Sequence, residues 1–418
     1  MKTRLALIVV LIVVLSLFAG CSDRLPKKTI LAEGGNLLWY NQPCAEYYCG
    51  NESRTYYTFT TSQGTVDVGC YDHLVKKVLP SVTVDDYGKV DDHGAPSLGI
   101  IKSGDERGKL IIAYSRHDSE LYVIKSSEAE SIVCFDERVM VDEGKCTYPR
   151  IQQIEDDIVI VYRKRIDSED EMEKRSEALY YVLSKDYGVT WSSPQRILNI
   201  DEGKWIFAAP FSQYGNKIAI AFDIYDSESG AIEDIRFLWL DYENGICEDL
   251  KGEEFSLPMN PEDASLALKT DESKEVRVWD VKVSEDGIPI ITYMLTGGDN
   301  TIAYSGRFDF DSKKWIHAKI AEGRICYYPS GIVIDEHDTD RVALAVNRDG
   351  ITEIEEWKTS DGGYNFNKEI SITSKSKTDQ FRPQYVQNYC EELRLIWLTS
   401  EYYKRWTNFK TDIWGIVR

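Results

Sequence analysis

The chain repeats one pair of strand-like segments at a spacing of about 50 residues. Each unit opens with a short polar or aromatic cluster, often followed by Pro, and continues with an alternating apolar run, a turn and a second apolar run. Seven such units follow one another between Leu37 and Thr399. Units of this period that are built from strands predict an all-β chain folded as a seven-bladed β-propeller, in which the first strand of each blade lines the axis.

The first 20 residues differ from the repeats and have the pattern of a signal peptide. Lys2 and Arg4 precede an apolar run, and Ala19-Gly20 leads into Cys21. The ending resembles a bacterial lipobox, so we expect a lipid on Cys21, a tether over residues 21–36 and the propeller over 37–418. An ordinary signal peptide or a membrane anchor is the alternative. The pattern predicts an exported chain held on the cell envelope through its lipid alone, at the outer membrane if the cell has one.

Eight cysteines remain after Cys21, and an even number in an exported chain indicates disulfides. Cys134 and Cys146 are spaced to close one loop, although the full pairing is not readable from the sequence. No CxxC pair or histidine spacing resembles a zinc site, so we expect neither a metal nor a cofactor.

The net charge of −21 argues against nucleic acid as a partner. An anionic polysaccharide or oligosaccharide would instead need a local basic pocket, which a set of residues near the second and third repeats could supply: His93, Arg116, His117, Arg150 and Arg163. We expect a monomer.

Those basic residues fall at the ends of two predicted hairpins. Residues 91–117 read DDHGAPSLGIIKSGDERGKLIIAYSRH, and residues 147–163 read TYPRIQQIEDDIVIVYR. Because a hairpin returns to the edge from which it starts, His93 should lie beside His117, and Tyr148 beside Arg163. The two imidazoles, the phenol and the guanidinium are therefore predicted to meet at one rim.

One motif marks the opposite face. Residues 184–191, SKDYGVTW, form a full Asp-box, S-x-D-x-G-x-T-W, and residues 359–366 form a degenerate copy. We assign Asp186, Gly188, Trp191, Asp361 and Gly363 a structural role, because Asp can accept bonds from its own turn, Gly allows positive φ, and Trp packs between blades.

The Asp-boxes and repeats resemble the sialidase-like BNR-repeat propellers. The ordered series DDH, RH, TYP, YR, VWD, YPSG and FRP is similar to a narrower branch, the ulvan lyases and related bacterial enzymes that cleave rhamnose–glucuronate polymers. The resemblance covers about Leu37 to Trp414 and implies that His93, His117, Tyr148 and Arg163 are the catalytic residues. Gly94 stands where those lyases often have Asn, which puts substrate identity in doubt, and the sialidase Arg-Ile-Pro is absent.

The resemblance implies β-elimination on a uronic acid, in which a cation neutralises the C6 carboxylate, a base removes the C5 proton and an acid protonates O4. Arg163 suits the carboxylate. Tyr148 is a candidate base and acid if nearby cations lower its pKa, and His93 or His117 is the alternative base. Further sugar contacts are expected from residues at the blade openings: Arg116, Trp279, Asp280, Tyr328 and Arg382.

Two other functions stay open at this point. A glycoside hydrolase on the same scaffold would use a carboxylate pair, for which Asp92 and Asp280 are the candidates. A glycan-binding propeller without catalysis is the third, because a fold does not fix a function.

Overall fold

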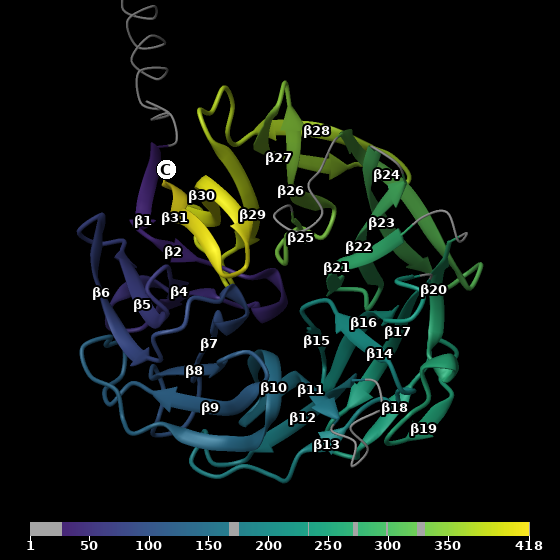
Figure 1. Ribbon diagram of the computed structural model, residues 1–418, viewed down its shortest axis with the longest axis horizontal. Helices are drawn as coiled ribbons and strands as arrows, with labels where there is room; N and C mark the ends of the chain where they lie inside the picture. Colours follow the sequence, from purple (N-terminus) through teal and green to yellow (C-terminus); the bar gives the residue numbers. More distant parts are fainter. Residues whose placement is uncertain are drawn as a thin grey trace, which may run out of the picture.

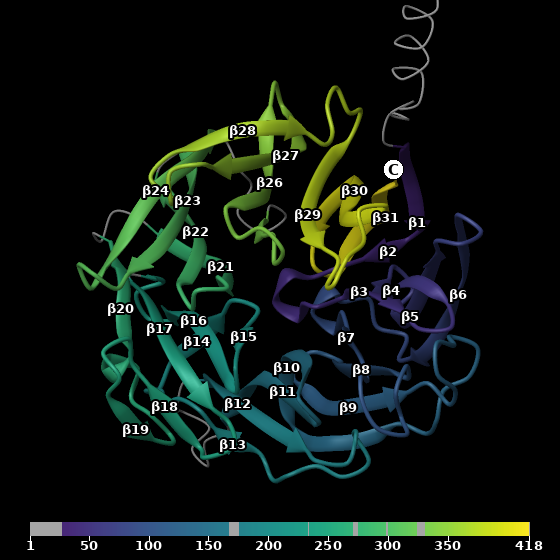
Figure 2. The same ribbon diagram turned by 180° about the vertical axis from the view of Figure 1, so that it is seen from behind.

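The computed structural model describes residues 27–166, 175–232, 234–270, 275–297, 300–323 and 331–417. They form blades of β-strands around a central axis, and the colours of Figure 1 pass round the ring in chain order. Figure 2 shows the ring from behind. Four of the five sheets are single blades and the 14-stranded sheet comprises three, which makes seven within the described ranges. The predicted all-β, seven-bladed propeller is confirmed.

The first three blades follow one another from the N-terminal side. Blade 1 contains β2 (Gly35–Asn36), β3 (Ala45–Cys49), β4 (Ser53–Thr61), β5 (Thr65–Asp72) and β6 (Lys77–Asp86). Blade 2 contains β7 (Ser97–Ile100), β8 (Leu110–Ser115), β9 (Ser119–Lys125) and the first half of β10 (Val139–Ile154). Blade 3 contains the second half of β10, β11 (Asp157–Ile166), β12 (Ser176–Ser184) and β13 (Gln195–Arg196).

The remaining four blades complete the ring. Blade 4 contains β14 (Lys204–Ala208), β15 (Ser212–Tyr214), β16 (Lys217–Asp226), β17 (Asp234–Asp241), β18 (Ile246–Glu248), β19 (Glu254–Ser256) and β20 (Ser265–Lys269). Blade 5 contains β21 (Glu275–Val283), β22 (Pro289–Gly297), β23 (Asn300–Asp309) and β24 (Lys314–Gly323). Blade 6 contains β25 (Ile332–Ile334), β26 (Arg341–Arg348), β27 (Ile351–Thr359) and β28 (Phe366–Ser371), and blade 7 contains β29 (Asp379–Tyr385), β30 (Leu393–Arg405), β31 (Asn408–Val417) and β1 (Lys27–Ala32).

Side chains on the inner strands hold neighbouring blades together through buried backbone N–H groups. Glu46 accepts from the N–H of Ile100 at 3.1 Å and Asp280 from that of Ile334 at 2.8 Å, each across 54 residues. Ser97 accepts from Ile151, also across 54 residues, and Asp223 from Val278 across 55. These bonds satisfy donors that would be costly to leave unpaired, and their constant separation is the period of the sequence repeat.

An excursion of blade 1 fills the axis. Between β2 and β3 the chain leaves the inner strand and forms the 3₁₀ turn η1 (Trp39–Asn41), and Figure 1 shows this purple segment reaching into the middle of the ring. Trp39 stacks on Trp279 at 4.3 Å between ring centroids, and Tyr40 packs on Tyr148 at 4.6 Å. The excursion therefore separates the two ends of the axis.

The N-terminal strand closes the ring. β1 pairs antiparallel with β31, from Lys27 opposite Val417 to Ala32 opposite Ile413, so it is the outer strand of blade 7. The prediction of a tether over residues 21–36 is wrong for its described part, because β1 and β2 belong to blades. The alternating sequence KKTILA buries Leu31 and Ala32 against the last blade, which lacks an outer strand of its own. Residues 1–26, with the expected signal peptide and the lipid site at Cys21, lie outside the described residues.

Both Asp-boxes form the expected turns after the third strand of their blades. Asp186 accepts from the N–H of Thr190 at 2.8 Å and from Ser184 Oγ at 2.8 Å, and Asp361 accepts from the N–H of Asn365 at 2.9 Å. Gly188 and Gly363 have φ of +83° and +96°. Trp191 packs on the core shared by blades 2 and 3.

The seven cysteines of the described residues, among them Cys134 and Cys146, are all free thiols, so the expected disulfides are not found there. Within the same residues, no helix has the length and apolar character to cross a membrane.

Candidate functional site

Asp91 organises the first part of the site. It precedes the short 3₁₀ turn η2 (Asp92–Gly94) and accepts from the His93 N–H at 3.0 Å, which caps the turn. The same carboxylate oxygen lies 2.7 Å from Nδ1 of His93. One side chain thus fixes both the backbone and the ring of His93.

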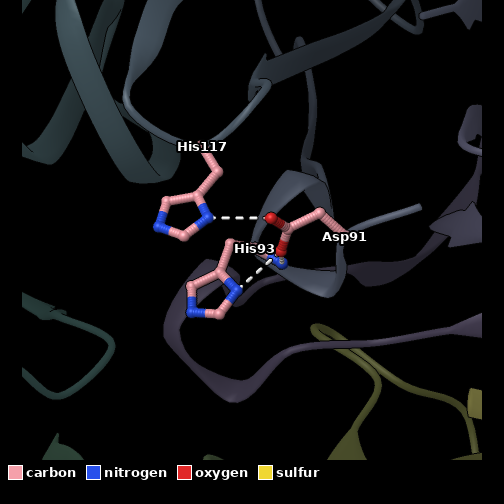
Figure 3. Close-up of side chains that lie close together, drawn as sticks. All are labelled: Asp91, His93 and His117. Atoms are coloured by element: carbon pink, nitrogen blue, oxygen red, sulfur yellow. Dashed lines mark hydrogen bonds and ion pairs between the residues drawn. The ribbon is translucent and has the colours of Figure 1, made fainter. Parts of the chain in front are cut away.

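His117 reaches the same carboxylate from the turn between β8 and β9. Its φ is +63°, a left-handed conformation uncommon outside Gly, and its Nδ1 lies 2.8 Å from the second oxygen of Asp91. The rings of His93 and His117 stack with centroids 4.1 Å apart and planes within 7°. Figure 3 shows both Nδ1 atoms facing Asp91 and both Nε2 atoms facing the other way, side by side. The sequence prediction that the two histidines are neighbours is confirmed.

The surrounding charges act on the proton occupancy of this pair. Burial lowers the pKa of His93, but hydrogen bonds and charges from Asp91 and Asp92 outweigh it, so its pKa is raised above the usual value. Burial would raise the pKa of Asp91, yet its bonds to the two imidazoles hold it well below the usual range. Asp91 is therefore an anion that favours a proton on the imidazole pair.

Tyr148 and Arg163 meet on the next blade, as predicted. Tyr148 interrupts β10 with a φ of +59°, at the bulge where the strand passes from blade 2 to blade 3. Its ring lies 5.6 Å from that of His93 and within 26° of parallel. The Arg163 guanidinium lies 4.4 Å from the Tyr148 ring centre. All four residues implied by the resemblance thus stand in one stack.

Burial decides the protonation of Tyr148. Its pKa is raised well above the usual value by burial, and the nearby Arg163 only partly offsets this. Nearby cations therefore do not lower the pKa of Tyr148 below its usual value, as the sequence analysis had considered, and Tyr148 is a neutral phenol near neutral pH. Arg163 lies 2.7 Å from Glu177, while its Nη1 is a buried donor without a hydrogen-bond partner in the described chain.

Arg382 was expected to contact sugar, but the structure buries it completely. It donates to Leu37 O at 2.6 Å and to Asp92 at 3.0 Å, and Tyr403 also donates to that carboxylate. Asp92 in turn lies 3.1 Å from Nδ1 of His93. Arg382 therefore supports the histidine from beneath rather than binding ligand.

Three other expected sugar contacts, Trp279, Asp280 and Arg116, do not reach the site. Trp279 is 1% exposed against Trp39, because the excursion covers the axis. Asp280 is fully buried and holds blade 6, and burial raises its pKa to about 6. Arg116 turns away from the histidines to Asp85, at 3.3 Å. Tyr328 lies outside the described residues.

Two residues near the histidines were not predicted as site residues. Asp91 was visible only as part of the paired aspartates before His93. Trp406 follows β30, presents its edge to the His93 ring at 5.8 Å and is 44% exposed. No short-range pattern links Trp406 to His93, because only closure of the ring brings them together.

Gly94 has a structural explanation. A Cβ added there would stand 2.0 Å from the hydroxyl of Tyr87. Tyr87 thus occupies the space that a side chain at position 94 would need, and a larger residue requires its displacement.

Asp91, His93 and His117 also form a group that could hold a metal ion, since their donor atoms lie within 4.8 Å of one another. The carboxylate–Nδ1 distances of 2.7 and 2.8 Å are those of charge-assisted hydrogen bonds. Hydrogen bonding accounts for the arrangement without an ion.

The fold and the Asp-boxes define a BNR-type propeller, and the comparison with protein families agrees. Residues 54–322, more than half of the chain, match the model described as BNR repeat-containing family member, so the chain belongs to that family. No curated protein matches the chain significantly.

The similar solved structures include an ulvan lyase of polysaccharide lyase family 25, with a TM-score of 0.75 and 15% identity over 94% of this chain and 96% of that one. The same family's structure bound to -[GlcA(1-4)Rha3S]- has a TM-score of 0.74 and 15% identity, with the same coverage. The polysaccharide lyase Uly1 has a TM-score of 0.63 and 12% identity over 90% of each chain. At these identities the likeness establishes the shared fold.

Proposed function

We propose that the chain is a polysaccharide lyase that cleaves a uronic-acid-containing polysaccharide by β-elimination. The observation that carries the proposal is the stacked imidazole pair on one carboxylate, with both Nε2 atoms directed away from it. The fold likeness to ulvan lyases supports the same class of reaction.

The pair is suited to carry one proton beyond neutrality. Two imidazolium rings 4.1 Å apart would repel each other by about 4 kcal/mol at an effective dielectric constant of ~20. Asp91 supplies one negative charge, and Asp92 is already paired with Arg382. Because its pKa is raised, His93 takes the proton. Nδ1 of His117 faces Asp91, which leaves its Nε2 directed toward a substrate.

The reaction then assigns a role to each ring. Nε2 of His117 removes the C5 proton, the electron pair forms the C4–C5 double bond, and the C4–O4 bond breaks with its electrons on oxygen. Tyr148 or the His93 imidazolium donates a proton to O4. The His93 charge and Arg163 stabilise negative charge that develops on the C6 carboxylate.

The hydrolase alternative loses its candidate residues. Asp92 and Asp280 are both fully buried and are held by structural hydrogen bonds. Neither could reach a glycosidic oxygen and a water on opposite faces of a sugar, as that chemistry requires.

Incubation with a panel of uronate polysaccharides, followed by near-ultraviolet absorbance of the unsaturated product, tests the proposal. We expect absorbance from the wild type, and its loss in His117→Ala with the fold retained. Loss in Tyr148→Phe assigns the proton donor to Tyr148, whereas retained activity assigns it to His93. Tyr364→Phe is the matched control, because that exposed tyrosine lies in an Asp-box. Reducing sugar without absorbance would indicate a hydrolase, and binding without turnover on any uronate glycan would indicate a glycan-binding propeller.

We also propose that the enzyme is exported and lipid-anchored at Cys21, on the sequence pattern alone. Labelling by a radioactive fatty acid in wild type and in Cys21→Ser tests this attachment, and equal labelling of both would contradict it.

A further inference from the structure

A second cavity opens at the end of the axis opposite the histidines. It has a volume of about 430 Å³ and is lined by inner-strand residues of blades 3 to 7 and by the excursion. Gln152 and Lys282 lie further along the strands that carry Tyr148 and Trp279, beyond the aromatic rings that pack across the axis. The size falls within the usual range of small-ligand sites, roughly 300–1,000 Å³.

Side-chain amides dominate the polar lining. Five residues supply them: Gln42, Gln152, Gln213, Gln387 and Asn388. They come from the excursion and from blades 3, 4 and 7, so they converge from different parts of the ring. An amide offers both a donor and an acceptor, which matches the paired donor and acceptor character of a sugar hydroxyl.

Part of this hydrogen-bonding capacity is unused. Gln42 is only 8% exposed, yet no bond to its side-chain amide exists within the described part of the chain. Because Gln42 lines the cavity, its amide can exchange hydrogen bonds with a ligand there. By contrast, Gln152 donates to Gln213 at 3.1 Å, so these two side chains are already oriented.

The remaining lining favours an uncharged ligand. Its ionisable groups are of both signs: Lys282 is cationic, Glu336 is anionic, and His337 Nε2 lies 3.5 Å from Glu336. Phe211 and the 44% exposed Tyr214 add aromatic surface, on which the apolar face of a sugar ring can pack. The histidine site differs from this cavity, because it combines one carboxylate with two imidazoles, an arrangement suited to proton transfer.

We propose that this cavity is a second carbohydrate-binding site, which takes a neutral sugar unit through the amides of Gln42, Gln152 and Gln387. It does not rest on the lyase reaction. It would let the protein hold a glycan at one end of the axis while the histidines act at the other.

Saturation-transfer difference NMR and titration calorimetry on the full chain test the site, with cellobiose, maltose and xylobiose as neutral probes and glucuronate as the charged probe. We expect at least one neutral probe to bind with a dissociation constant on the order of 1 mM. The double variant Gln152→Ala/Gln387→Ala should weaken binding by at least about tenfold, because two hydrogen-bonding amides are removed. Gln63→Ala, an exposed amide in the β4–β5 turn, is the matched control.

The outcomes are separable from those of the lyase test. Binding that survives His117→Ala but is lost in the double variant supports the proposal, whether or not the chain cleaves uronate. Absence of binding by all neutral probes overturns it, as does binding unchanged in the double variant or lost in His117→Ala. Thermal unfolding of each variant shows whether a loss of probe binding comes from the changed cavity or from a loss of the fold. If the double variant unfolds, Gln387→Ala alone is tested under the same criteria.

Discussion

Replacing Asp91 by Asn should reduce kcat strongly while the propeller stays folded. The carboxylate makes hydrogen bonds of 2.7 and 2.8 Å to the two Nδ1 atoms, and both depend on its charge. An amide keeps the shape but offers one acceptor only, so one imidazole must take the wrong tautomer or turn away. Charge-assisted bonds contribute about 1.5–3 kcal/mol each. Loss of one bond, and of the charge assistance of the other, is therefore about 2–4 kcal/mol, or a factor of roughly 30 to 10³ in rate.

The assay is the initial rate of ultraviolet absorbance on the uronate polymer that the wild type cleaves. Asp85→Asn is the matched control, because Asp85 pairs with Arg116 and Arg138 and touches neither histidine. The control should stay within about twofold of wild type, since exposed ion pairs contribute little. A folded Asp91→Asn enzyme with kcat within about threefold of wild type would refute the assignment of Asp91 as the positioning residue of the imidazole pair.

Four further results are expected. Arg382→Met should lower the free energy of unfolding by about 3–5 kcal/mol in urea titration, because it removes the guanidinium that is paired with the buried Asp92. The exposed Arg405→Met should change it by less than about 0.5 kcal/mol, and equal effects would contradict the importance of the buried pair. Asp186→Ala should cost about 1–3 kcal/mol of stability through the lost turn bonds and leave the lyase rate unchanged, and a slower rate at equal stability would contradict its structural role. The pKa of His93 is raised in the folded state, so its contribution to stability is complete below its ordinary pKa of 6.5 and is lost as pH rises through the folded pKa. His93→Gln should therefore destabilise the protein more in urea titrations at acid pH than at alkaline pH. The reverse order would refute the raised pKa. Removal of metal ions with EDTA should leave the lyase rate unchanged, and recovery of a lost rate by added zinc or calcium would show that the Asp91 group binds an ion.

The grouping of the four side chains at one rim could be predicted from the sequence, because strand direction determines which side chains meet. A hairpin of alternating residues returns to its starting edge, so His93 had to meet His117, and Tyr148 had to meet Arg163. The same reasoning placed Trp279 at the axis, where its ring packs on Trp39. It could not show that Trp39 would cover that position, because an excursion from an inner strand has no periodic pattern.

Contacts between distant segments could not be predicted from the sequence, for a related reason. Asp92, Arg382 and Tyr403 come together only because the last blade packs beside the start of the 91–117 hairpin. Trp406 reaches His93 by the same route. Arg382 was read as a ligand contact because a basic residue at a strand opening is usually exposed, whereas here a buried carboxylate holds it.

The pairing of β1 with β31 has a consequence for the order of folding. Gly34 donates to Asp412 across 378 residues, so this seam joins the first and the last strand of the ring. Blades 2 to 6 can each assemble from local hairpins as the ribosome releases them, whereas the final seam must wait until β31 has been released. Until then the Leu31 and Ala32 faces lack their partner, so a nascent chain stalled before β31 presents an open sheet edge that invites chaperone capture or aggregation.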